Sequence, residues 1–350
     1  MAILKFNDVG ITAISACVPS KVVSNYDLGY MMPQENLERL IKSTGIEERR
    51  IADENVCSSD LCYKAAKKLM EDNQINPESI DMLIFTTLTP DFVSPPTTPI
   101  LQNRLGLLTA TACIDMSFAC SGFVYALATA YSYASNIGVN RVLLLVGETM
   151  SKITNVRDKV NYPLYGDAGT ACLIEKGKFG ESVFELTADG SGADYVKVPY
   201  GGFRNKLVAD NLVDKEREDC NYRRDVDITM DGMETFNHAI THIPKQIKIL
   251  MKEANITNED IDYLISHQAN KLMIDYIVKK MKIDNNKAPF CISKYGNTSC
   301  ASIPLTIVSE LYNKMIGEKH IMLSAIGAGW SFGTAYLTTR DLQVSHIIEY

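Results

Sequence analysis

The sequence predicts an α/β protein made of two similar halves, because three segments of its N-terminal half recur in the same order in its C-terminal half. The first match keeps an offset of 181 residues over its whole length. One match of this kind is compatible with chance, whereas three in one order indicate duplication. The matched segments are 64–84 with 245–265, 141–148 with 320–327, and 169–174 with 333–338.

The first matched segment predicts a helix, a turn and a buried strand in each half. Amphipathic helical spacing is followed by the apolar runs IDMLIF and IDYLIS, which are typical of buried strands. RVLLLVGE and HIMLSAIG predict the next buried strand, and GTACLI and GTAYLT form the third match. Helices alternating with short apolar strands favour sheets covered on both faces, so we expect one half at 1–178 and the other at 179–350.

Two segments break the symmetry between the halves. The first half has an additional loop from Ser151 to Tyr165. Residues 199–227 are rich in Arg, Lys, Asp and Asn and show no clear periodicity, so this segment is either a surface excursion or a lid. Functional sites are expected at the strand ends where the halves meet.

Length and composition favour a cytoplasmic globular enzyme. The 350 residues are 46% hydrophobic and 22% charged, ordinary values for a chain with two cores. The net charge of −7 argues against a nucleic-acid partner. The start MAILKFNDVG lacks a secretory pattern, and no apolar run is long enough to span a membrane.

Nine cysteines are present, but none forms a CxxC pair and several lie in apolar runs. This distribution argues against a zinc site or a disulfide framework and favours reduced, mostly buried thiols. His238 and His242 stand four residues apart on an expected helix, where a surface pair is favoured over a metal site. We therefore expect no metal.

Cys120 is the first candidate for chemistry. An apolar strand is expected to end near Ser117, and the residues Ala-Cys-Ser-Gly at 119–122 then open a long helix. The helix N-terminus favours the thiolate form, which attacks thioesters. Taken alone, the pattern fits a packed core cysteine equally well.

His267 and Asn297 are the other two candidates. His267 ends a buried strand in IDYLISHQAN, and Asn297 lies in a glycine-containing turn, KYGNTSCASIP, before a helix. A hydrogen-bonded core histidine and an ordinary turn asparagine explain these residues when each is taken alone. The repeat aligns each candidate with a strand end or helix start of the other half: Cys120 with Ala301, Asn297 with Met116, and His267 with Thr86.

Six motifs resemble the ketoacyl-acyl-carrier-protein synthase III family over nearly the whole chain. They are DMSFACSGFVYAL, SHQAN, YGNTSCASIP, STGIEERRIA (43–52), YGDAGTA (165–171) and GAGWSFGTA (327–335). The resemblance implies the five-layered αβαβα fold of thiolases, a homodimer and no metal or redox cofactor. It also implies a catalytic triad of Cys120, His267 and Asn297.

The resemblance further implies a two-stage reaction. Cys120 would accept an acyl group from a thioester, and malonyl-acyl-carrier protein would then lose CO₂ and attack it. His267 and Asn297 would donate hydrogen bonds to the enolate oxygen, a kind of contact whose loss typically costs about 10²–10³ in rate. The backbone N–H groups of Cys120 and Ala328 would form the oxyanion hole.

Departures from the family pattern bear on the acyl donor. Arg39 and Ser43 stand where members that use coenzyme A carry Trp and Arg, and Lys159 replaces a further Arg. Lysine does not reproduce the bidentate arginine contact with phosphate, so these changes argue against coenzyme A as donor and leave an acyl-carrier protein or the acyl donor of a specialised pathway.

The resemblance to the family also indicates where a carrier protein would dock and where the acyl chain would lie. An acidic carrier protein is expected to dock on Gln268, Lys271, Lys245, Lys248 and Lys252, although a solvated helix face explains these lysines equally well. The acyl channel is expected at Phe92, Tyr162, Leu164 and Ile326.

Three alternative functions remain open at this point. A related acyltransferase of secondary metabolism would use a non-malonyl nucleophile, and the departures near the coenzyme A site favour it. A non-catalytic subunit of a heterodimeric synthase would carry a damaged triad, and the triad is intact. A cysteine hydrolase would need water positioned at the acyl-enzyme.

Overall fold

Two mixed β-sheets organise the chain in the computed structural model, which describes residues 2–350. The seven-stranded sheet contains β2 (Val9–Val18), β5 (Met82–Thr86), β6 (Ala112–Met116), β7 (Arg141–Thr149), β8 (Asp167–Lys176), β17 (Gln343–Val344) and β18 (Ile348–Glu349). The five-stranded sheet contains β1 (Ala2–Phe6), β9 (Ser182–Ala188), β14 (Tyr263–Ser266), β15 (Glu318–Gly327) and β16 (Ser331–Arg340).

The predicted duplication is confirmed by the strand pairing. β5 pairs parallel with β7, which pairs antiparallel with β8, which pairs antiparallel with β2. β14, β15, β16 and β9 repeat this order and these directions in the second sheet. The apolar runs therefore became the buried strands that the sequence predicts.

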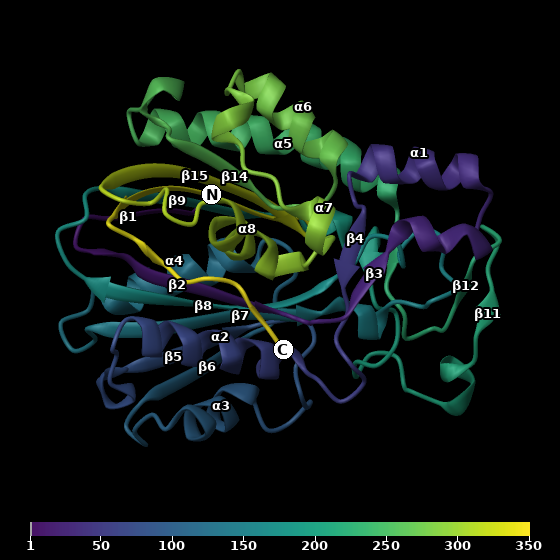
Figure 1. The fold of residues 1–350 in the computed structure, drawn as a ribbon, viewed down its shortest axis with the longest axis horizontal. Helices are drawn as coiled ribbons and strands as arrows, with labels where there is room; N and C mark the ends of the chain where they lie inside the picture. Colours follow the sequence, from purple (N-terminus) through teal and green to yellow (C-terminus); the bar gives the residue numbers. More distant parts are fainter. Residues whose placement is uncertain (1) are drawn as a thin grey trace.

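Eight α-helices occur in residues 2–350. They are α1 (Gln34–Thr44), α2 (Ser58–Asp72), α3 (Thr97–Leu105), α4 (Gly122–Ala134), α5 (Gly232–Glu253), α6 (Lys271–Met281), α7 (Ile292–Tyr295) and α8 (Ser302–Glu310). Six of them, α2 to α6 and α8, form the other three layers of the sandwich (Figure 1). α4 and α8 pack in one core between the two sheets. α2 and α3 cover the outer face of the first sheet, and α5 and α6 cover that of the second. The expected αβαβα fold is confirmed.

The ends of the chain cross between the two sheets. β1 pairs with β9 of the second sheet, although it belongs to the first half of the sequence. β17 and β18 pair with β2 of the first sheet, although they follow the second half. The boundary between 178 and 179 stays a prediction, because each sheet takes a strand from the other side of it.

The charged segment at 199–227 is held by ion pairs. Lys215 and Arg217 both contact the carboxylate of Asp225, at 2.7 and 2.6 Å. Two short ribbons brace the region, namely β10 (Val196–Lys197) with β13 (Thr229–Met230) and β11 (Lys215–Glu216) with β12 (Tyr222–Arg223). A third ribbon, β3 (Val22–Ser24) with β4 (Glu48–Arg50), lies near α7.

The structure shows the state of the cysteines and of the histidine pair singled out in the sequence. In the described part of the chain, all nine cysteines are free thiols, and no group of His, Cys, Asp and Glu is arranged to hold a metal ion. His238 and His242 are half-buried rather than a surface pair, because they stack on each other and His238 stacks on Trp330. Within residues 2–350, no helix has the length and apolarity to cross a membrane.

Candidate active site

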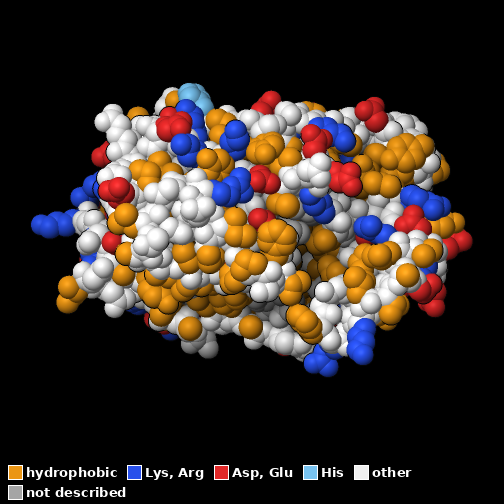
Figure 2. All heavy atoms as spheres, turned by 90° about the horizontal axis from the view of Figure 1, so that it is seen from below, with side chains coloured by type: hydrophobic (Ala, Val, Ile, Leu, Met, Phe, Trp, Pro, Cys, Tyr) orange, Lys and Arg blue, Asp and Glu red, His pale blue; other side chains and the backbone are white. Residues whose placement is uncertain are grey.

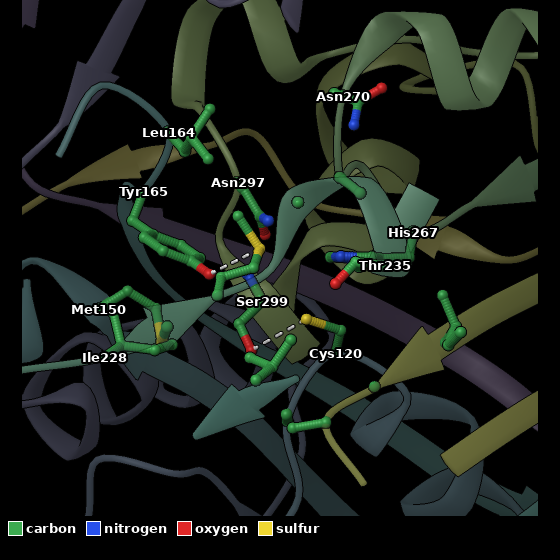
Figure 3. A pocket seen from close by; sticks show the side chains of 18 of the residues that line it. Cys120, Met150, Leu164, Tyr165, Ile228, Thr235, His267, Asn270, Asn297 and Ser299 are labelled. Atoms are coloured by element: carbon green, nitrogen blue, oxygen red, sulfur yellow. Dashed lines mark hydrogen bonds between the residues drawn. The ribbon is translucent and has the colours of Figure 1, made fainter. Parts of the chain in front are cut away.

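One cavity brings the three predicted residues together at the junction of the halves (Figure 3). Cys120, His267 and Asn297 all line this cavity, which has a volume of about 330 Å³. Its remaining wall is mostly apolar and comes from both halves and from the flanks of the charged segment. Apolar lining residues include Leu88, Met150, Leu164, Tyr165, Val196, Ile228, Met230 and Ile326.

Cys120 lies in the turn between β6 and the N-terminus of α4. Gly122 follows it, and a Cβ on this glycine would come within 2.9 Å of Thr86 and of Phe118, so the turn needs a residue without a side chain. The Cys120 thiol donates to Ser299 Oγ at 3.8 Å. Burial raises the pKa of Cys120 to about 12, and this effect is larger than the opposite effect of the contact with Ser299. The resting residue is therefore a thiol rather than the thiolate that its helix-end position suggests.

His267 follows β14, where its backbone N–H donates to the carbonyl of Ser324 at 2.8 Å. Its Nδ1 lies 2.7 Å from Ser302 Oγ at the start of α8, which fixes the plane of the ring. Burial lowers the pKa of His267 to about 4. The imidazole is therefore neutral at physiological pH and retains one N–H for donation.

Asn297 is held by its neighbours in an orientation that presents its amide nitrogen. Its backbone N–H donates to Leu164 at 2.8 Å, and its Oδ1 accepts from the backbone N–H of Ser299 at 2.9 Å. The preceding Gly296 has a φ of +69°, and a Cβ there would lie 2.9 Å from the carbonyl oxygen of Leu164. Because Oδ1 is committed, Nδ2 is the amide group that remains for a ligand.

Ala328 lies on the same wall, in the turn between β15 and β16. Gly327 allows this turn to reach the start of α4, because a Cβ on it would lie 2.8 Å from Ser121 Oγ. The hydroxyls of Ser121 and Ser331 join the two segments at 2.6 Å. The residues expected to form the oxyanion hole, Cys120 and Ala328, thus share one cavity.

Two of the four residues expected in the acyl channel line this cavity. Leu164 and Ile326 line the cavity, whereas its lining within residues 2–350 does not include Phe92 or Tyr162. Phe92 is 57% exposed in the loop before α3. The ring of Tyr162 packs under the guanidinium of Arg49 at 4.5 Å instead.

The expected docking surface is also corrected in part. Gln268 is 1% exposed, and its amide is committed to Ser266 and Cys291, so it cannot contact a carrier protein. Lys271 begins α6 directly after Asn270 of the cavity wall. Lys252 is exposed but lies about 26 Å along α5 from Thr235, the last residue of that helix on the wall. The remaining two lysines, Lys245 and Lys248, are exposed between these positions.

The residues that depart from the family pattern occupy different surroundings. The side chain of Arg39 is 73% exposed and pairs with Glu35 on the outside of α1. Ser43 donates its hydroxyl to the backbone of Leu40 at 3.0 Å. Lys159, in contrast, lines the cavity, as does Lys197.

Three polar residues of the site were not predicted from the sequence. Ser302 positions His267, and Ser299 contacts both Cys120 and Asn297. Glu148 at the end of β7 is fully buried and accepts a hydrogen bond from Ser299. A carboxylate that ends the apolar run VLLLVG was a signal that could have revealed it.

The five-layered fold and a cavity that joins a cysteine, a histidine and an asparagine define a thiolase-like condensing acyltransferase. Residues 114–192 match the family 3-oxoacyl-[acyl-carrier-protein (ACP)] synthase III, and residues 251–339 match its C-terminal counterpart. The chain belongs to the beta-ketoacyl-[acyl-carrier-protein] synthase III family.

Known relatives resemble the chain over nearly its whole length. The beta-ketoacyl-[acyl-carrier-protein] synthase III of Caldanaerobacter subterraneus is 36% identical over 94% of this chain and 97% of its own. A putative 3-oxoacyl-[acyl-carrier-protein] synthase 3 of Campylobacter jejuni is 34% identical over 99% and 98%. The crystal structure of a 3-oxoacyl-(acyl-carrier protein) synthase from Burkholderia xenovorans superposes with a TM-score of 0.93 at 32% identity, covering 100% of this chain and 99% of that one.

Proposed function

We propose that the protein joins an acyl thioester to a malonyl thioester carried by acyl-carrier protein, with loss of CO₂ and formation of a 3-oxoacyl-acyl-carrier protein. The observation that carries this proposal is the single cavity that holds Cys120, His267 and Asn297. An acyl group is first transferred to the Cys120 sulfur, and the donor leaves as a free thiol. No metal or redox cofactor is needed for either stage.

The second stage is supported by the two donors opposite the cysteine. Decarboxylation of the malonyl group leaves negative charge on the oxygen of its thioester carbonyl. His267 is neutral, because burial lowers its pKa to about 4, and Asn297 is oriented by the N–H of Ser299. Two neutral, preorganised N–H donors stabilise such an enolate without the cost of reorganisation. The enolate carbon then attacks the acyl-Cys120 carbonyl, whose oxygen faces the backbone N–H groups of Cys120 and Ala328.

An acyl-carrier protein is also the favoured acyl donor. Arg39 is exposed and pairs with Glu35, whereas Lys159 and Lys197 line the cavity. Lys159 donates to the carbonyl of Cys220 at 3.3 Å, and Lys197 pairs with the exposed Asp194. A phosphopantetheine arm carries one phosphate, which lysine can bind without the bidentate geometry that arginine provides. Lys271 begins α6 beside this region, where it pairs with Asp275 at 2.5 Å, and an acidic carrier surface would have to compete with that carboxylate for it.

A homodimer is part of the proposal. β6 ends the first sheet, where it pairs with β5 on one side only. An open edge strand favours pairing with the same strand of a second copy. Figure 2 shows hydrophobic side chains gathered on the face seen from below, and Phe92 and Val93 before α3 are exposed. The nine free thiols favour the cytoplasm, a reducing compartment.

The intact mass of the protein tests this function. The protein is mixed with panels of acyl-carrier proteins and acyl-coenzyme A donors, and malonyl-acyl-carrier protein is then added. The expected result is a mass gain on Cys120 that the malonyl thioester discharges with release of CO₂. Loading that malonyl thioester fails to discharge would identify an acyltransferase for another nucleophile, and hydrolysis without malonyl thioester would identify a hydrolase. Absence of loading with every donor would contradict the proposal and point to a non-catalytic subunit.

A further inference from the structure

Glu148 is a fully buried carboxyl group beside the cavity that the reaction described above does not use. It ends β7 and receives hydrogen bonds from the backbone N–H of Leu88 at 3.1 Å and from the hydroxyls of Thr87 and Thr89 at 3.1 and 2.9 Å. A buried carboxylate requires such donors, since burial without them costs several kcal/mol. These contacts fix the carboxyl group and leave its Oε1 facing the active site.

A single side chain connects this carboxyl group to the nucleophile. Ser299 Oγ accepts a hydrogen bond from the Cys120 thiol at 3.8 Å and donates one to Glu148 Oε1 at 3.3 Å. Figure 3 shows the first of these contacts, with the two side chains directed toward each other. Ser299 has a φ of +51°, a conformation that favours glycine, so its hydroxyl is held between the two groups at a conformational cost. The donors and acceptors therefore point in one direction, from sulfur to carboxylate.

We propose that Glu148 accepts the proton of the Cys120 thiol during acyl loading, with the Ser299 hydroxyl as the relay. The Ser299 proton moves to Glu148 while the Cys120 proton moves to Ser299, and the Cys120 sulfur forms its bond to the acyl carbon. The bond between that carbon and the donor sulfur breaks, and the departing thiolate takes the proton back from Glu148 through the same relay. The step conserves protons and electrons and leaves Glu148 ionised for the next cycle.

The titration of the carboxyl group suits this role. Burial raises the pKa of Glu148 to about 7, although the hydrogen bonds that it receives oppose the shift. The titratable groups that face it are thiols, namely Cys62 of α2, Cys120 and Cys300. A general base works best when its pKa lies near the working pH. Cys120 needs such a base to lose its proton, because burial raises the pKa of its thiol.

His267 is the other conceivable proton acceptor, and the structure disfavours it. Burial lowers the pKa of His267 to about 4 and raises that of Glu148 to about 7, so the imidazole is the weaker base of the two. Its Nδ1 is already committed to Ser302. A histidine that stays neutral suits the enolate, whereas the carboxylate suits the thiol. The site then assigns separate groups to its two stages.

Alkylation of Cys120 by iodoacetamide tests the relay. This inference rests on Cys120 being the acyl acceptor, but alkylation reports thiol ionisation without any acyl or malonyl substrate, so it fails or succeeds separately from the proposed function. The rate is measured from pH 5 to 10 by peptide mass, which separates Cys120 from the accessible Cys57, Cys113 and Cys220. Wild type is expected to show a rise in rate centred near pH 7.

Three variants separate a relay from a structural contact. Glu148→Gln and Ser299→Ala are expected to lose the rise near pH 7 and to react roughly 10²-fold more slowly at pH 8, the lower end of general-base effects. Glu148→Asp keeps an acid and is expected to retain part of the rise. Cys300→Ala is the matched control, because it removes a different 3.3 Å contact of Glu148 and leaves the relay intact. It is expected to keep the wild-type profile.

Two outcomes would overturn the inference. The first is an unchanged pH profile in Ser299→Ala, and the second is loss of the rise in Cys300→Ala to the same extent as in Glu148→Gln. Thermal unfolding of each variant establishes that the protein is folded. If Glu148→Gln does not fold, Ser299→Ala and Glu148→Asp still decide the question.

Discussion

Replacement of Asn297 by alanine separates the two stages of the reaction. The change removes the Nδ2 donor proposed for the enolate, and loss of one such donor typically lowers the rate by about 10²–10³, or about 2.7–4 kcal/mol. It also removes the Oδ1 that accepts from the Ser299 N–H at 2.9 Å. An unsatisfied buried N–H costs about 1–3 kcal/mol, so the variant is expected to be less stable as well as slower in condensation.

Asn297→Asp is the matched variant for this experiment. Its side chain has nearly the same shape and keeps an oxygen that accepts from Ser299, but it has no N–H to donate. We therefore expect it to lose condensation at least as completely as Asn297→Ala while Ser299 keeps its partner. Both variants keep the Cys120 thiol, and Asn297→Asp also keeps the partner of the Ser299 N–H, so both are expected to accept an acyl group.

The assay measures the two stages on the same protein. Intact mass gives the rate of acyl loading, and release of labelled CO₂ from malonyl-acyl-carrier protein gives the rate of decarboxylation. Loading within about threefold of wild type together with a loss of CO₂ release by about 10²-fold supports the assigned role. An equal loss of loading and decarboxylation in both variants would refute it, because Asn297 would then serve the cysteine or the fold rather than the enolate.

Three further predictions concern loading, channel size and acid stability. Cys120→Ala is expected to abolish the acyl mass gain, and a mass gain that persists on the folded variant would place the nucleophile elsewhere. Ile326→Phe places a larger side chain in the cavity and is expected to reduce loading of long acyl chains about tenfold more than loading of acetyl groups. Intact mass across a series of acyl chain lengths measures this difference, and equal effects on all chain lengths would show that Ile326 does not line the acyl channel. Two buried groups are expected to change the stability of the fold with pH in opposite directions. The pKa of His267 is lowered to about 4, so its contribution to stability is lost as pH falls below 6.5, because the unfolded state then binds the proton. Glu148, with its pKa raised to about 7, loses stability as pH rises above 4.5, because the folded state holds the proton. The two contributions oppose each other, each at about 3 kcal/mol. In urea unfolding between pH 4.5 and 6.5, the stability of Glu148→Gln should therefore rise with pH more steeply than that of wild type, and equal pH dependence of the two proteins would contradict the assignment.

The sequence predicted those parts of the site that lie at ends of regular elements. His267 directly follows β14, and Cys120 lies in the turn between β6 and α4. The internal repeat places such ends of elements at one junction even though they are distant in the chain. Periodicity and the repeat thus sufficed for the two sheets and the intervening helices. The motifs of the family then supplied the roles of these residues.

The remaining parts depend on contacts between distant side chains. Glu148, Ser299 and Ser302 act through hydrogen bonds that form only when β7, α8 and the turn before α8 meet. Gln268 follows a functional histidine in sequence, but its amide turns into the protein toward Ser266. Tyr162 has the size of a channel residue, yet it packs on Arg49, a partner that no spacing rule indicates.

The crossing of the chain ends bears on how the protein is made. β1 is synthesised about 180 residues before its partner β9, and β2 is synthesised long before its partners β17 and β18. Pairings of such long sequence separation form slowly, because a large loop must close before the contact stabilises it. The first half therefore cannot complete its sheet on the ribosome as an independent unit. A nascent chain arrested before residue 343 lacks two strands of the first sheet and is expected to be the species that needs a chaperone.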